Sequence, residues 1–103
     1  MTLPVIAVFV AKPGFEEKLE QLFRSVVDTT LGEEGCISYQ INRDRADPRR
    51  FVFIEEWQSQ ADLDRHLAAP HMKPLSEQVP ACIESSYSLL LTKLAGGAAS
   101  AGE

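Results

Sequence analysis

The chain has 103 residues, of which 45% are hydrophobic and 24% charged, and its formal net charge is −5. This composition is typical of a folded globular protein and excludes a long disordered chain, and the length corresponds to one domain. The acidic charge disfavours nucleic acid as a partner, because no basic stripe is present to displace counterions from phosphates.

The cysteines and the N-terminus exclude further classes. Cys36 and Cys82 have no CxxC spacing, so they predict neither a disulfide scaffold nor a zinc site. The apolar run from Val5 to Ala11 is too short for a membrane span and lacks the layout of a signal peptide. We therefore expect a cytoplasmic protein without membrane contact.

The first half of the chain predicts a strand and a helix. Leu3 to Lys12 is rich in Val, Ile and Phe and apolar on both faces, which is typical of a strand covered on both sides. After Pro13-Gly14, one apolar stripe at helical spacing predicts an amphipathic helix that ends between Thr30 and Gly35. The stripe consists of Phe15, Leu19, Leu22, Phe23, Val26 and Val27.

A hairpin follows. Cys36 to Arg43 alternates apolar and polar residues, and Phe51 to Trp57 reads as a second strand, with a turn around Asp47-Pro48 between them. On the second strand Phe51, Phe53, Glu55 and Trp57 share one face. The sequence does not indicate which face meets the helices.

The remainder predicts a second helical region and a last strand. Ser59 is a candidate N-cap for a short helix that Pro70 stops, and His71 to Val79 has apolar residues at helical spacing. Ile83 to Leu94 reads as a strand. Residues 95–103 have nothing to bury and are expected to form a disordered tail.

The order β-α-β-β-α-β predicts an α+β, ferredoxin-like domain over residues 1–94, with helices on one face of a four-stranded antiparallel sheet. Two strands are apolar on both faces, but the helices can cover only one. A second copy of the chain can cover the other face of the sheet without any further element, so we expect a homodimer. The alternative is a monomer whose apolar sheet face binds a ligand.

Two histidines and one carboxylate are the candidate catalytic residues. His66 lies between Leu63 and Leu67 on an apolar helix stripe, and His71 follows a proline. On a continuous helix residues five apart diverge by about 140°, so the pair does not predict a metal site, and we expect no metal. Each histidine could instead be a hydrogen-bonded core residue or a solvated loop residue.

Glu55 is unusual because a lone carboxylate on an apolar strand face needs a partner. Candidate partners are His66, Arg43 across the hairpin, and a residue of another subunit. Glu55 then either orients a histidine that acts as a base or forms a structural ion pair.

The candidate substrate-binding residues lie on the same hairpin. Trp57 and Phe53 offer walls for a flat aromatic ligand, Tyr39 a phenol and Asn42 an amide. No G-x-G-x-x-G or phosphate loop occurs, so no nucleotide or flavin cofactor is expected.

An ordered run of short motifs then suggests a family. Residues 34–39 (EGCISY), 47–57 (DPRRFVFIEEW), 63–67 (LDRHL) and 70–72 (PHM) resemble the antibiotic biosynthesis monooxygenase domain over about residues 3–94. The resemblance implies a dimeric α+β barrel of two ferredoxin-like units. It also implies His66 and His71 as base or substrate contacts, with Trp57 and Tyr39 as pocket wall and donor.

The activity implied first is a cofactor-independent monooxygenase that oxidises an aromatic phenol or quinol to a quinone with O₂. The haem-degrading branch carries an asparagine on the first strand, which is missing here, and no anion cradle supports the branch that handles a phosphorylated signal. The alternatives are a non-catalytic dimeric binding module for a small hydrophobic metabolite and an isomerase acting on a small signalling metabolite.

Overall fold

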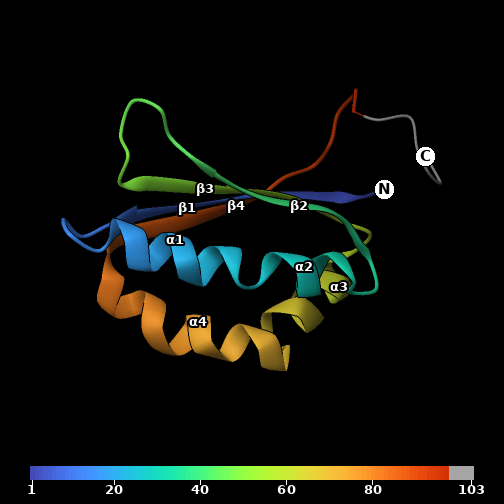
Figure 1. The fold of residues 1–103 in the computed structure, drawn as a ribbon. Coiled ribbons are helices and arrows are strands. Elements are labelled where there is room, and N and C mark those ends of the chain that lie inside the picture. Colours follow the sequence, from blue (N-terminus) through green and yellow to red (C-terminus); the bar gives the residue numbers. More distant parts are fainter. Residues whose placement is uncertain (98–103) are drawn as a thin grey trace.

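The computed structural model describes residues 1–97; the expected tail lies outside the described residues from residue 98 onward. Four strands form one antiparallel sheet in the order β2-β3-β1-β4. All helices lie on one face of it (Figure 1). The elements are β1 (Leu3–Ala11), α1 (Glu16–Arg24), α2 (Val27–Leu31), β2 (Cys36–Arg43), β3 (Arg50–Trp57), α3 (Gln60–Leu67), η1 (Pro70–Met72), α4 (Lys73–Gln78), η2 (Val79–Cys82) and β4 (Ile83–Leu90). The predicted ferredoxin-like α+β fold is confirmed.

The apolar stripe predicted a single first helix, and this prediction is wrong. The chain forms two helices, α1 and α2, with a break at Ser25 and Val26. The Ser25 hydroxyl donates to the backbone carbonyl of Leu22, and the following Val-Val and Thr-Thr pairs are β-branched residues of low helix propensity. The break turns α2 so that Thr30 is fully buried. The chain then leaves α2 toward Glu33.

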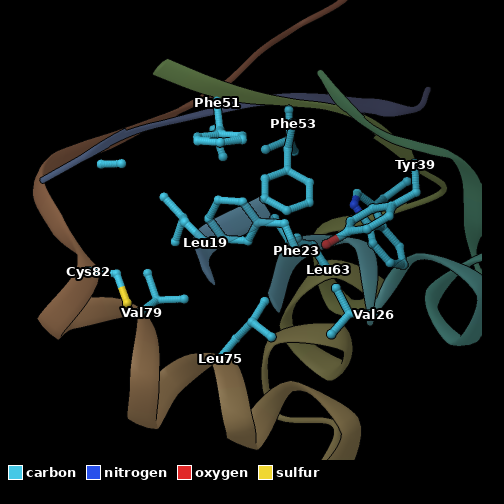
Figure 2. Close-up of a cluster of buried hydrophobic side chains, with 14 residues drawn as sticks. Leu19, Phe23, Val26, Tyr39, Phe51, Phe53, Leu63, Leu75, Val79 and Cys82 are labelled. Carbon is cyan, nitrogen blue, oxygen red and sulfur yellow. The ribbon is translucent and has the colours of Figure 1, made fainter. Parts of the chain in front are cut away.

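The strand face that the sequence left open is now assigned. Phe51, Phe53, Glu55 and Trp57 face the helices and are all buried, whereas Ile54 on the opposite face is 42% exposed. Figure 2 shows Phe51 and Phe53 meeting Leu19 and Phe23 of α1. Phe23 packs edge-on against Phe53 with ring centroids 4.8 Å apart. This aromatic cluster fixes the distance between sheet and helices at one end of the inner layer.

The last strand is shorter than predicted, ending at Leu90 rather than Leu94. The reason is the length of its partner, because β1 begins at Leu3 and the Leu91 amide already donates to the carbonyl of Pro4. Beyond that point Lys93 turns to the Glu56 carboxylate, 2.6 Å away.

The opposite face of the sheet carries apolar side chains that no helix of residues 1–97 covers (Figure 1). Ile54, Tyr87 and Leu89 remain about half exposed there. The register places Ile6 opposite both Ile54 and Leu89, so these side chains form one continuous patch. No helix within residues 1–97 is long and apolar enough to cross a bilayer. A cytoplasmic location stays a prediction.

Gly35 brings the loop after α2 against the start of α3. Its φ is +84°, a left-handed conformation, and a Cβ there would collide with the side chain of Asp62. Asp62 is held by hydrogen bonds at the start of α3. Its carboxylate accepts hydrogen bonds from the Ser59 hydroxyl and the Arg65 guanidinium, and its backbone amide donates to the Ser59 hydroxyl. The close approach at Gly35 therefore sets where the neighbouring loop meets α3.

We predict that Gly35→Ala destabilises the protein more than Gly14→Ala does. Both glycines have positive φ, so each substitution costs about 1–2 kcal/mol of backbone strain. A Cβ at Gly14 meets open space, whereas one at Gly35 displaces Asp62 from the α3 cap. Urea unfolding of both variants measures the difference, and equal losses would show that the approach to Asp62 is not a constraint.

Candidate functional site

A cavity of about 460 Å³ lies between the inner face of the sheet and the second helical region. Its walls come from β1, β2, β3 and β4 on one side and from α1, α3, η1, α4 and η2 on the other, and they are mostly apolar. Phe9, Phe53, Leu63, Leu75 and Leu90 are among the apolar residues. This volume lies within the range of sites that enclose small organic ligands.

His66 is the histidine in the cavity wall. It projects from α3, is 1% exposed, and its Nδ1 lies 2.6 Å from Oε2 of Glu33. A carboxylate can only accept, so Nδ1 carries the proton and donates it to Glu33. The structure leaves no side-chain nitrogen or oxygen of residues 1–97 both buried and unpaired. The second nitrogen, Nε2, has no partner among these residues and so is not fully buried, and because His66 lines the cavity we infer that Nε2 faces it.

Aromatic rings hold the His66 ring from two sides. The Trp57 ring lies against it with centroids 4.7 Å apart, and the Tyr39 ring meets it edge-on at 5.3 Å. Together with the bond to Glu33, these contacts leave the imidazole little freedom to rotate. The orientation of Nε2 toward the cavity is thus fixed before any ligand arrives.

Glu55 also lines the cavity, but its partner is one that the sequence analysis missed. Its Oε1 accepts a hydrogen bond from Nε1 of Trp57 at 2.9 Å. Arg43, one of the expected partners, pairs instead with Glu20 and stacks on Phe51. Burial raises the pKa of Glu55, and the Trp57 bond opposes the shift. The available signal was the spacing of Glu55 and Trp57, since alternate residues of a strand share a face.

The other expected substrate contacts divide between the two faces of the sheet. Tyr39 and Phe53 line the cavity. Tyr39 extends from β2 toward the helix layer (Figure 2), and burial followed by the Glu55 charge raises the pKa of its phenol, which stays a proton donor. Trp57 lies behind His66 rather than in the cavity wall. Asn42 lies on the outer face, where it donates to the carbonyl of Val52.

Glu33 joins the two histidines. His71 Nε2 lies 3.3 Å from the same Glu33 Oε2 and 3.0 Å from the Thr30 hydroxyl, while its side chain stays outside the cavity wall. The sequence predicted that the two histidines point apart, on the premise that they share one continuous helix. This prediction is wrong, because α3 ends at Leu67 and His71 belongs to η1. Nothing in the spacing of Glu33 indicated this position. Ligand atoms of Glu33, His66 and His71 all lie within 4.8 Å of one another.

We predict that Glu55→Gln stabilises the protein near neutral pH. Because the pKa of Glu55 is raised from 4.5, the folded state binds its proton more tightly than the unfolded chain does. The stability that this carboxyl contributes is complete below about pH 4.5 and is lost as the pH rises through the raised pKa. Glutamine keeps an acceptor for Trp57 without the charge.

Urea unfolding of both proteins between pH 4 and pH 8 tests this linkage. The advantage of Glu55→Gln over the wild type should grow with pH. An advantage that is constant across this range, or a loss at pH 8, would mean that burial does not penalise the Glu55 charge.

Comparison with known proteins assigns the chain to a family. Residues 2–78 match the model of the antibiotic biosynthesis monooxygenase family. The chain is 40% identical over 87 residues to a protein of Escherichia coli named "Probable quinol monooxygenase YgiN", covering 75% of this chain and 84% of that one. The crystal structure of PA3566 from Pseudomonas aeruginosa superposes with a TM-score of 0.87 at 34% identity, covering 91% of this chain and 95% of that one.

A further relative, sll1783 of Synechocystis, is 29% identical over 84 residues; the match covers 82% of this chain and 57% of that longer protein. The matched family segment contains the whole Glu33–His66–His71 cluster together with Tyr39, Glu55 and Trp57. The chain belongs to the antibiotic biosynthesis monooxygenase family.

Proposed function

We propose that the protein is a cofactor-independent monooxygenase that oxidises a small aromatic phenol or quinol to a quinone with O₂. The observation that carries this proposal is the unpaired Nε2 of His66 at the wall of an apolar cavity, with Nδ1 held by Glu33. Membership of the monooxygenase family and the likeness to a protein named as a quinol monooxygenase support it.

The first step is removal of the substrate's hydroxyl proton by His66 Nε2. The Glu33 carboxylate stabilises the imidazolium that forms, as a hydrogen-bonded carboxylate does for other histidine bases. The resulting phenolate lies among Phe9, Phe53 and Leu63, which exclude water and leave the anion electron-rich. The Tyr39 phenol is the candidate hydrogen-bond donor to the anion.

The phenolate then reduces O₂ by one electron, and the radical pair combines to form a hydroperoxide at a ring carbon. Loss of water from this hydroperoxide leaves one oxygen atom on that ring carbon as a new carbonyl, so a phenol gives a quinone and a quinol gives a hydroxyquinone. The second oxygen leaves as water with the hydroxyl proton, which the His66 imidazolium returns, and the hydrogen of the attacked ring carbon. The reaction balances with substrate and O₂ alone, so the protein's share is to move a proton and keep the cavity dry.

We further propose that the protein is a homodimer whose partner covers the outer face of the sheet. Ile6, Ile54, Tyr87 and Leu89 form an apolar patch there that the described chain leaves in solvent. Patches of this kind on a soluble protein mark interaction surfaces. A two-fold pair of sheets gives the dimeric barrel expected for the family.

We predict that purified, chelator-treated protein consumes O₂ with at least one member of a panel of hydroquinones and polycyclic phenols. His66→Gln should lower the rate by at least about 100-fold, because glutamine fills similar space but cannot take a proton. An O₂ electrode with quinone absorbance measures both. The no-protein panel corrects for autoxidation, and the thermal midpoint of His66→Gln verifies its fold.

Unchanged turnover in His66→Gln would contradict the role of this residue. Ligand binding without O₂ consumption across the panel would favour a non-catalytic binding module, and conversion of a ligand without O₂ would favour an isomerase. Either result would overturn the proposed reaction.

We predict a mass of twice 11.4 kDa by size-exclusion chromatography with light scattering. Ile54→Asp should give a monomer, because it places a charge in the outer patch. Leu31→Asp is the matched control, since Leu31 is similarly exposed but lies on α2 at the helix side. A monomeric wild type, or dissociation in the Leu31 variant alone, would contradict the proposed interface.

A further inference from the structure

We propose that Glu33, His66 and His71 form a binding site for a divalent transition-metal ion, with Zn²⁺ as the representative, and that the bound ion prevents His66 from acting as a base. The inhibitory part rests on the proposed function, whereas the site itself does not. Two imidazole nitrogens and one carboxylate oxygen, supplied by a loop, α3 and η1, come within 4.8 Å of one another. Two histidines with one carboxylate are an established donor set for zinc with an open fourth position.

One of the three ligand separations already suits a tetrahedral ion, one must open, and the separation of the two histidine nitrogens, up to 4.8 Å, must shorten. With metal–ligand distances of about 2.0–2.1 Å, neighbouring ligand atoms of a tetrahedral ion lie about 3.3 Å apart. Glu33 Oε2 and His71 Nε2 already have this separation, at 3.3 Å. The 2.6 Å contact between Glu33 and His66 Nδ1 must open, as it does when an ion replaces the shared proton. Glu33 can move because it lies in the loop between α2 and β2.

Burial gives the site an entrance and a closed end. The side chains of Glu33 and His71 are 16% and 20% exposed, whereas that of His66 is 2% exposed. An ion therefore meets His71 and Glu33 first and reaches Nδ1 of His66 last. The Thr30 hydroxyl lies 3.0 Å from His71 Nε2, the atom that would bind the ion, so this contact must be given up, which leaves the hydroxyl placed to hold a water on the ion.

Binding at Nδ1 changes what His66 offers to the cavity. Without the ion, Nδ1 donates its proton to Glu33 and Nε2 is free to accept one. A neutral imidazole bound to a metal through Nδ1 must carry its proton on Nε2. The same ring then presents a donor to the substrate instead of an acceptor. The ion also binds the Glu33 carboxylate, which then no longer pairs with His66. Metal binding therefore acts directly on the proposed base.

The test uses protein without an affinity tag, and both histidines of the chain belong to the site. Calorimetry with Zn²⁺ gives affinity and stoichiometry, and the visible absorption of Co²⁺ reports the geometry of its ligands. Glu33→Gln removes one ligand, and Glu34→Gln is the matched control because it removes an exposed charge from the next residue. His71→Ala removes a second ligand and leaves the Glu33–His66 contact in place.

We expect one Zn²⁺ per chain, a tetrahedral Co²⁺ spectrum, and affinity lowered at least about tenfold by Glu33→Gln and by His71→Ala but not by Glu34→Gln. No binding by the wild type, or equal affinities in Glu33→Gln and Glu34→Gln, would overturn the site. Neither result depends on catalysis.

The inhibitory role is tested by O₂ uptake with and without saturating Zn²⁺. We expect the ion to suppress uptake at least about tenfold in the wild type and in Glu34→Gln, and His71→Ala to be less sensitive at the same concentration. Stimulation by Zn²⁺, or uptake that the bound ion leaves unchanged, would overturn this role. Absence of O₂ uptake by ion-free protein would overturn the proposed function, and the inhibitory role with it. The existence of the metal site would still be decided by the calorimetric measurement of Zn²⁺ binding.

Discussion

The short contact between the Glu33 carboxylate and the His66 imidazole joins the loop after α2 to helix α3. It determines which nitrogen of His66 carries a proton and directs the other nitrogen toward the cavity. The break between α1 and α2 and the close approach at Gly35 bring the loop to α3. A loop carboxylate and a helical imidazole thereby lie side by side. The proposed role of His66 as a base needs this contact itself, whereas its proposed role as a metal ligand needs both groups near enough to hold one ion between them.

The second polar group of the cavity is kept at a cost to stability. Glu55 lies on the inner face of β3 among aromatic residues, where burial penalises its charge and raises its pKa. Trp57 holds its carboxyl in place with the indole N–H. An apolar residue at this position would pack without that penalty, so stability is given up here for a polar group that faces the cavity.

The order of elements and the sharing of strand faces could be predicted, because both follow from local periodicity in residues such as Phe51, Phe53 and Trp57. The break at Ser25 could not, since it depends on weak propensities that the long apolar stripe outweighed. His66 and Tyr39 were expected in the site and line the cavity, whereas Asn42 lies on the other face.

Glu33 was missed because the contact joins residues 33 and 66, and one sequence carries no sign of such convergence. The relation of His66 to His71 was misjudged for a related reason. Their spacing was measured along a continuous helix, but the chain leaves α3 between them. The homodimer, which follows from strands that are apolar on both faces, stays a prediction.

The most direct test of this arrangement is the tautomer of His66, read from long-range ¹H–¹⁵N correlations of ion-free protein at pH 8. The chain has two histidines, and His66→Gln assigns the remaining signals to His71. We predict a neutral ring protonated at Nδ1 with an unprotonated Nε2, and loss of this preference in Glu33→Ala, which leaves Nδ1 without its acceptor. A ring protonated at Nε2 would contradict the pairing with Glu33 and leave the cavity without the proposed base.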